Sequence, residues 1–245
     1  MRNSLLQNSV LIVVNYFGIK PNWNAIDLLK DEFDLITIED NCHSLMKLDD
    51  LGSFGDYSFN SLRKILPILS GSQIINNKTE LYKFDKASLK MRFPSLSEVK
   101  YFLRSYKSTN LKRKEISRTK NDIDPIKNKQ SIDFISHRVL SNNFFDIDNI
   151  ALTRRNNYSY WESYLDKKDF IFFEVRTSSI YCPYVFPCIA KSKGIMEKWM
   201  DWGIKNKISI INWPKIPFNQ HDHFGHDNLN YVLLFPVNHQ FNLSI

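Results

Sequence analysis

The 245-residue chain is poor in glycine and cysteine, and it has no long apolar run. No segment approaches the roughly 20 apolar residues that a membrane-spanning helix needs, so we expect no membrane association. Its three cysteines, Cys42, Cys182 and Cys188, lack metal-ligand spacing, which favours reduced thiols in a cytoplasmic protein. The sequence contains neither Gly-x-Gly-x-x-Gly nor a Walker lysine motif, which argues against a dinucleotide site and excludes a P-loop.

What the chain does contain indicates a globular α/β protein. Hydrophobic residues make up 43% of it, enough for a large core. The run Val10–Val14 is apolar throughout, as in a parallel strand buried on both faces. Apolar residues then recur at helical spacing from Trp23 to Phe33, and a second strand is expected at Leu35–Ile38. This strand–helix–strand order predicts an α/β fold.

The second half predicts a long helix followed by smaller α+β structure. Around Asp146–Asp166 one helical stripe contains Ile150, Arg154, Tyr158, Trp161 and Leu165. Further strands are expected at Phe170–Val175, Tyr184–Ala190, Ile208–Trp213 and Tyr231–Val237, with a helix at Gly194–Trp202 ended by Gly203. We therefore expect a partial large domain over residues 1–145, then a linking helix and small C-terminal domain over residues 146–245.

The net charge of +7 is concentrated in one segment. Between Arg104 and Lys129 lie nine Lys or Arg residues against three Asp or Glu residues, with little apolar periodicity. This composition predicts an exposed, poorly packed insertion at about 104–129. Such a basic segment also suits the diphosphate of a nucleotide sugar. It lacks the signatures of nucleic-acid modules, so we expect no nucleic-acid partner.

A histidine cluster near the C-terminus invites a metal interpretation. His221, His223 and His226 surround Asp222 in an Asn-rich stretch, but their spacing matches no closed zinc site. We expect an exposed loop there and no metal site.

Glycine, scarce elsewhere, is concentrated in one stretch. Three of the seven glycines, Gly52, Gly55 and Gly71, fall within it, which indicates unusual backbone angles or close approach. The stretch begins where an apolar strand ends in Glu39-Asp40. In open α/β sheets ligands bind at the carboxyl ends of strands, so Asp40 is a candidate ligand contact; a helix cap or turn residue is the alternative. A turn with His43, a short aromatic strand and the motif Ser61-x-x-Lys64 follow.

This pattern resembles the cofactor-binding core of the DegT/DnrJ/EryC1/StrS aminotransferases, which are fold-type I pyridoxal-phosphate enzymes. Two further segments are similar to the family: Arg154–Tyr158, and Phe235–His239, which resembles its Leu-Pro-x-His segment. The resemblance implies a PLP-dependent transferase-like large-domain fragment with a smaller C-terminal domain. It also implies pyridoxal 5'-phosphate as cofactor, glutamate as amino donor, and a nucleotide-linked keto-sugar of surface polysaccharide biosynthesis as substrate.

The resemblance also implies a role for each site residue. Lys64 is the Schiff-base lysine, and Asp40 keeps the pyridine nitrogen protonated so that the ring accepts carbanion charge. His43 contacts the cofactor ring or its hydroxyl, or is simply a half-buried loop residue. Ser61 reaches the phosphate, and Ser58 is also expected among the cofactor-binding residues.

The register at the lysine departs from the family pattern. Five residues after Ser58, where most members place the lysine, this chain has Arg63, whose guanidinium cannot form a Schiff base. The neighbouring Lys64 is therefore the chemically competent residue. Relatives with histidine in place of the lysine are dehydratases, but no histidine occurs between His43 and His137.

The family's glycine turn for the phosphate has no counterpart, since no glycine precedes Gly18. We therefore expect an N-terminally truncated or divergent member. Two functions stay open. One is an aminotransferase whose site is completed by a homodimer partner or a companion N-terminal chain. The other is a non-catalytic relative that binds a partner or a sugar nucleotide.

Overall fold

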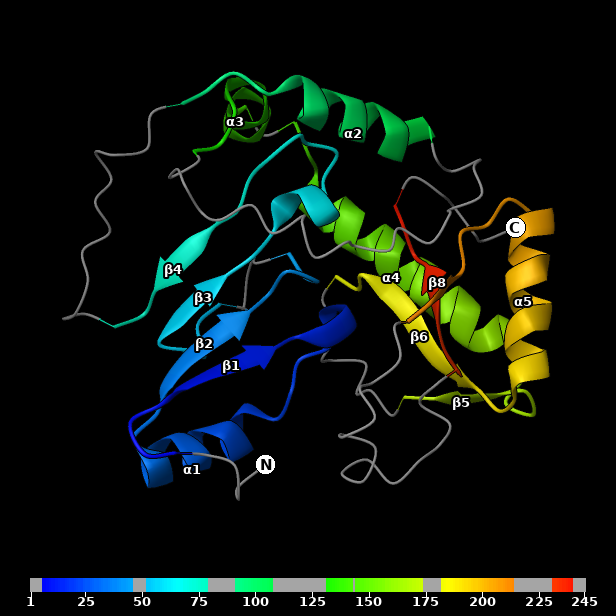
Figure 1. Ribbon diagram of the computed structural model, residues 1–245, viewed down its shortest axis with the longest axis horizontal. Helices are drawn as coiled ribbons and strands as arrows, with labels where there is room; N and C mark the ends of the chain where they lie inside the picture. Colours follow the sequence, from blue (N-terminus) through cyan, green and yellow to red (C-terminus); the bar gives the residue numbers. More distant parts are fainter. Residues whose placement is uncertain are drawn as a thin grey trace.

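The computed structural model describes residues 6–45, 52–78, 91–107, 131–142, 144–173, 182–213 and 231–239. These residues form two four-stranded sheets, one in each half of the chain, with the long helix α4 (Ile147–Tyr164) beside the second (Figure 1). The first sheet has the order β1-β2-β3-β4, and the second has the order β5-β6-β8-β7. The α/β fold expected from the sequence is confirmed.

Three parallel strands and one antiparallel strand build the first sheet. They are β1 (Val10–Val14), β2 (Ile36–Asp40), β3 (Tyr57–Phe59) and the antiparallel β4 (Ile74–Asn76). Helix α1 (Trp23–Phe33) connects β1 to β2. Its N-cap Asn22 accepts a hydrogen bond from Ala25, and it ends at Asp34, which is left-handed with φ 48°. The strand–helix–strand unit lies where the apolar pattern predicts it.

Helix α1 covers one face of this sheet. Trp23 and Ile26 pack against Leu11, Val13 and Leu35 to form a buried cluster. Polar contacts with Asp56 also hold the helix in place. The Asp56 carboxylate accepts hydrogen bonds from Lys30 Nζ (2.7 Å) and from the backbone and hydroxyl of Thr37 (2.8 and 3.0 Å). The helix is thus fixed to β2 and β3 by apolar burial and by a partly buried ion pair.

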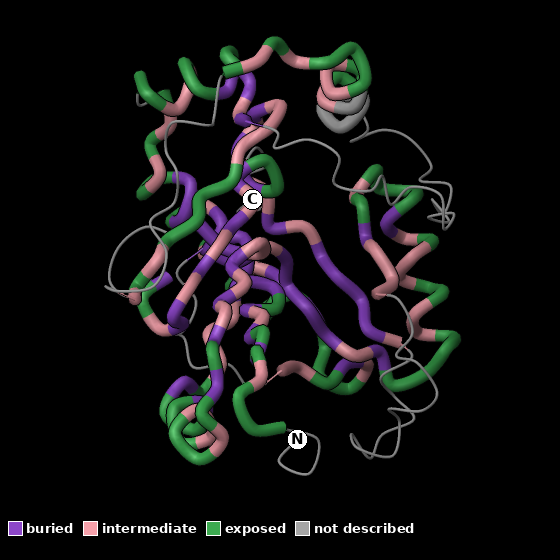
Figure 2. Tube along the Cα trace, turned by 60° about the vertical axis from the view of Figure 1, so that its left-hand side comes forward, coloured by how far each residue is buried: buried purple, intermediate pink, exposed green. Residues whose placement is uncertain are grey.

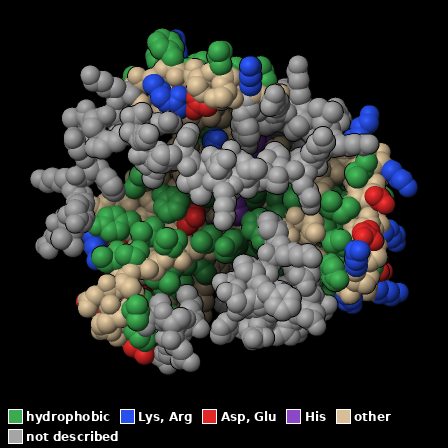
Figure 3. All heavy atoms as spheres, in the orientation of Figure 1, with side chains coloured by type: hydrophobic (Ala, Val, Ile, Leu, Met, Phe, Trp, Pro, Cys, Tyr) green, Lys and Arg blue, Asp and Glu red, His purple; other side chains and the backbone are tan. Residues whose placement is uncertain are grey.

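The opposite face of the same sheet stays open. Val10 is 56% exposed, Ile12 57% and Ile74 60%. The strand register places these three residues on one surface of the sheet, together with Ile38 and Tyr57. Figure 3 shows hydrophobic side chains gathered over this sheet. Parallel sheets are normally covered on both faces. The expectation that the run Val10–Val14 is buried on both faces is wrong, because Val10 and Ile12 on the face opposite α1 are more than half exposed.

The second sheet and its helices hold the larger core. Its strands are β5 (Phe170–Phe172), β6 (Val185–Ala190), β7 (Ile211–Asn212) and β8 (Val232–Pro236), and α5 (Lys193–Lys205) packs on it. The expected α4 stripe is buried at every position, and Trp161 packs on Phe235 at 4.8 Å between ring centroids. Figure 2 shows buried residues along these strands and exposed ones on the outer helices.

Two sequence predictions about the extent of helices need correction. Gly203 does not end α5, which continues to Lys205. Gly203 is buried, and a Cβ on it would lie 2.8 Å from the carbonyl oxygen of Ile208, so glycine is required there by close packing. Residues 104–107, expected in a loop, belong to helix α2 (Leu96–Lys107). The rest of the basic insertion and the histidine cluster at 221–226 lie outside the described residues.

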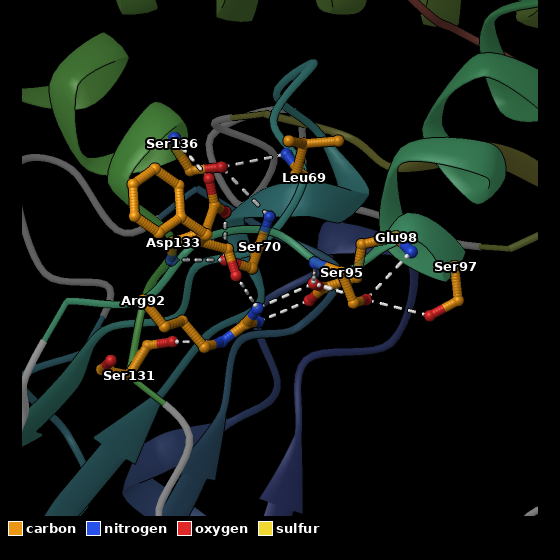
Figure 4. A network of polar contacts seen from close by, with 10 residues as sticks. Leu69, Ser70, Arg92, Ser95, Ser97, Glu98, Ser131, Asp133 and Ser136 are labelled. Atoms are coloured by element: carbon orange, nitrogen blue, oxygen red, sulfur yellow. Dashed lines mark hydrogen bonds and ion pairs between the residues drawn. The ribbon is translucent and has the colours of Figure 1, made fainter.

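A polar network that the sequence did not suggest ties α2 and α3 (Phe134–Ser141) to the first sheet (Figure 4). Ser136 Oγ accepts hydrogen bonds from the backbone of Leu69 and Ser70, and Ser70 contacts Asp133, the N-cap of α3. Burial raises the pKa of Asp133, but the hydrogen bonds that its carboxylate accepts from Ser136 and Ser70 outweigh this effect and hold the pKa below its ordinary value. The chain after β3 is therefore anchored from outside the sheet.

We predict that Gly55→Ala destabilises the fold whereas Gly194→Ala does not. A Cβ at Gly55 would lie 2.6 Å from the carbonyl oxygen of Tyr57 and 2.8 Å from the amide of Glu39. Overpacking against backbone should cost on the order of 3 kcal/mol. At Gly194 the nearest atom is 4.0 Å away, so the stability should hold or rise by under about 1 kcal/mol. Denaturant unfolding followed by tryptophan fluorescence checks both; equal stabilities would contradict the prediction.

Candidate active site

The carboxyl edge of the first sheet gathers the polar residues that the sequence singled out. Asp40 is the last residue of β2, and Cys42 and His43 occupy the turn that follows. Asp40 Oδ1 accepts a hydrogen bond from the backbone of Cys42 at 2.8 Å, which orients the carboxylate. Lys64 ends η3 (Leu62–Lys64), the short 3-10 helix that follows β3. Neighbouring parallel strands therefore deliver the carboxylate and the lysine to one edge.

Helix α4 fixes the position of η3. Leu62 and three buried residues that follow Lys64 pack in one cluster with Ile150 and Ala151 of α4. These three residues are Ile65, Leu66 and Ile68. The Lys64 side chain itself is exposed. Burial on one side of η3 and exposure on the other hold the lysine backbone while leaving its amine accessible.

A buried amide layer, which sequence reasoning missed, lies beneath this edge. Glu39 is fully buried, and its carboxylate accepts hydrogen bonds from Gly52 (3.1 Å), Phe54 (3.3 Å) and Asn15 Nδ2 (3.0 Å). Asn15 Nδ2 also donates to Asn41. Three donors compensate the buried charge, as burial requires. One feature of the sequence could have revealed this layer: an asparagine directly follows each parallel strand, at Asn15, Asn41 and Asn60.

His43 lies at the centre of an aromatic group. Its ring stacks on Tyr184 at 4.6 Å with an interplanar angle of 6°, and Trp213 meets it edge-on at 6.2 Å. The backbone of Phe17 donates a hydrogen bond to His43 Nδ1 at 3.3 Å. In the neutral ring the proton therefore belongs on Nε2, which can donate to a ligand.

The charges around His43 come from Asp40 and Lys64. The pKa of His43 is lowered to about 4, chiefly by burial and then by the charge of Lys64, while the charge of Asp40 opposes the shift. Burial also raises the pKa of the Cys42 thiol to about 11, helped by a hydrogen bond to Asp40 and opposed by Lys64. The charges of Asp40 and Lys64 thus influence the pKa values of both His43 and Cys42. At pH 7 the imidazole and the thiol are both neutral.

The turn η2 (Tyr16–Gly18) supports this arrangement at a cost in backbone strain. Phe17 has φ 62°, in the left-handed region that bulky residues avoid, and such strain is characteristic of functional sites. Its amide donates to His43, and its carbonyl accepts from Tyr184 at 2.9 Å. Both backbone hydrogen bonds hold the strained residue in place.

The two candidate serines differ. Ser58 is fully buried on the α1 side of the sheet, where its hydroxyl donates to the carbonyl of Gly52 at 2.8 Å. It faces away from Asp40, because Ser58 pairs with Glu39 in the strand register. Ser61 precedes η3 and is half-buried, and its side chain does not cap that helix. Of the two, Ser61 lies closer in sequence and structure to Lys64.

Several solved structures share the fold of this chain. The chain aligns with a DegT DnrJ EryC1 StrS aminotransferase from Brucella abortus at TM-score 0.58 and 15% identity, covering 95% of this chain and 60% of that one. It aligns with the Escherichia coli GDP-4-keto-6-deoxy-D-mannose-3-dehydratase, solved with hydrated PLP, at TM-score 0.62 and 14% identity. That alignment covers 99% of this chain and 66% of the dehydratase.

A third similar structure is Helicobacter pylori PseC, an aminotransferase involved in pseudoaminic acid biosynthesis, at TM-score 0.59 and 14% identity. It is covered over 62% of its length and this chain over 95%. The chain therefore spans roughly two thirds or less of these proteins and shares their fold, as the sequence resemblance implied. No family model and no curated protein sequence matches the chain.

Two other searches of the described residues gave no site. No group of three or more His, Cys, Asp or Glu side chains is placed to hold a metal ion in the parts of the chain that the structure describes. Among the same residues, no helix is long and apolar enough to cross a membrane.

We predict that Lys64→Met raises the pKa of His43 above about 4, because it removes a cation that disfavours the imidazolium. Asp40→Asn should lower the pKa, since it removes the opposing anion. An NMR titration of the His43 ring measures both shifts, and Lys193→Met, an exposed lysine on α5, serves as the control. Similar His43 pKa values in all three variants would show that Lys64 and Asp40 lie out of electrostatic reach.

The lowered pKa of His43 also determines how the free energy of unfolding changes with pH. Between pH 6.5, the ordinary histidine value, and about 4, the unfolded chain binds more protons than the folded one. The contribution of a neutral His43 is therefore complete above pH 6.5 and is lost as the pH falls toward 4.

Proposed function

We propose that this chain carries the greater part of the active site of a pyridoxal-phosphate-dependent sugar aminotransferase. Glutamate is the amino donor in this proposal, and the acceptor is a nucleotide-linked keto-sugar used for surface polysaccharide. The fold shared with sugar aminotransferases and with a PLP-containing dehydratase supports the reaction class. Three free cysteines suit a cytoplasmic enzyme.

The observation that carries the proposal is that Asp40 ends β2 while Lys64 lies just past the end of the neighbouring parallel strand β3. A cofactor that binds through its aldehyde to a lysine, and through its ring nitrogen to a carboxylate, needs both groups at one sheet edge. Two neighbouring parallel strands supply them here. When bound, pyridoxal phosphate supplies the electron sink that transamination needs.

Each residue then has a defined task. Lys64 provides the amine that binds the cofactor covalently. Asp40, oriented by the Cys42 amide, keeps the pyridine nitrogen protonated. His43 is held neutral, with Nδ1 occupied by Phe17, so its Nε2–H donates to an acceptor on the ring. Ser61 is the candidate phosphate contact.

A second polypeptide completes the proposed enzyme, as a homodimer partner or a companion chain. The open face of the first sheet supports this, because an apolar parallel sheet is normally covered.

Reductive trapping tests the lysine assignment. The purified chain is mixed with pyridoxal phosphate, reduced with borohydride, digested and mapped by mass spectrometry. We expect the cofactor on Lys64. Lys64→Arg keeps the charge but cannot bind the aldehyde, so the label should disappear, whereas Lys193→Arg should retain it. Labelling spread over many lysines, or retained in Lys64→Arg, would refute the assignment.

We further predict that the chain alone binds the cofactor weakly. No glycine turn for the phosphate is recognisable, and each lost charge-assisted hydrogen bond should cost about 1.5–3 kcal/mol. Losing two weakens binding by about a hundredfold or more. An absorbance titration with pyridoxal phosphate measures this, with and without excess inorganic phosphate. Tight binding by the chain alone would mean that the described residues hold the phosphate after all.

A further inference from the structure

Arg154 is a buried cation that the proposed chemistry does not use. It projects from the middle of α4 and is only 3% exposed. Its Nη1 donates to the carbonyl oxygens of Pro183 (2.9 Å) and Tyr184 (3.2 Å), while its buried Nε has no partner among the described residues. Both acceptors are neutral, and no carboxylate of the described residues contacts the guanidinium. A buried charge normally has a counter-charge.

His239 directly follows Asn238, whose carbonyl accepts from Asn157 of α4, and it carries a second unsatisfied nitrogen. Its Nδ1 is buried and has no partner among the described residues. The pKa of His239 is lowered to about 4, chiefly by burial and then by the charge of Arg154. The ring is therefore neutral at pH 7 and can donate one hydrogen bond. Cys182, also near Arg154, supplies no negative charge because burial raises the pKa of its thiol.

The two residues are held together from α4 and the end of β8. Asn157, one turn after Arg154, donates to the carbonyl oxygens of Val237 (3.4 Å) and Asn238 (3.1 Å). These contacts fix the segment that carries His239 against the helix. On the other side, Arg154 holds the backbone of Tyr184, whose ring stacks on His43. The pair therefore adjoins the candidate active site through a single residue.

We propose that Arg154 and His239 form a binding subsite for the carboxylate of a small organic acid. A carboxylate supplies the missing counter-charge and accepts from both unpaired nitrogens. The assignment deepens the proposed function and rests on it in one respect: the acid would be the amino donor or the oxo acid that it becomes. Arg154 would then serve as substrate contact and as a support for Tyr184.

The test uses glutarate, which has two carboxylates but neither an amino nor a keto group, and needs no cofactor. In the full chain labelled at histidine, the His239 ring signals are assigned with His239→Phe and titrated with pH. We expect glutarate to raise the pKa of His239 by one unit or more, a tenfold change in its proton affinity. The exposed His137 should not respond and is the internal reference.

The variants separate binding from folding. Arg154→Gln should weaken glutarate binding at least tenfold, and the exposed Arg138→Gln should leave it unchanged. If Arg154→Gln does not fold, His239→Phe, measured by calorimetry, should still lose affinity several-fold. No shift of His239 at glutarate concentrations that leave His137 unmoved overturns the proposal. A stronger response to inorganic phosphate overturns the carboxylate assignment.

Failure of the proposed function gives a different result. A chain that binds glutarate through Arg154 but carries no trapped cofactor on Lys64 would retain the subsite and lose the aminotransferase assignment. A chain trapped on Lys64 that ignores glutarate would do the reverse.

Discussion

Close packing of three backbone segments around Gly18 holds the candidate site together. A Cβ at this residue would lie 2.9 Å from the carbonyl oxygen of Cys182 and 3.0 Å from that of His43. The turn after β1, the turn after β2 and the chain entering β6 therefore meet with no side chain between them. His43 stacks on Tyr184, and Phe17 bonds to both, only because these backbones approach so closely. The two halves of the chain are joined at the residues on which the proposed chemistry depends.

A neutral histidine between a carboxylate and a lysine gives the site its electrostatic character. Burial and Lys64 keep the proton off His43, and its bond from Phe17 selects the tautomer. His239 is kept neutral in the same way by burial and Arg154. Each imidazole thus has a basic side chain near it and offers a hydrogen bond without adding charge. Anionic ligands suit such surroundings.

Elements defined by periodic burial were predictable from the sequence. The helix at Trp23–Phe33 and the α4 stripe were correct because apolar spacing records which face is buried. The run at Val10–Val14 is a strand as predicted, but the expected burial on both faces was wrong, because a continuous apolar run does not show whether a second layer covers it. Gly203 was misread as a helix end, since only the tertiary approach of Ile208 explains it. The buried Glu39 network was missed because polar residues in a core leave no apolar pattern. Helical spacing placed Arg154 on the buried stripe. Only the structure shows that its Nε has no hydrogen-bond partner among the described residues.

The open face of the first sheet has a consequence for the life of the chain in a cell. The surface formed by Val10, Ile12 and Ile74 is apolar and exposed to solvent, as hydrophobic surface is in a partly folded protein. Exposed apolar faces of this kind adhere to one another. While this face is uncovered, the chain is therefore prone to self-association.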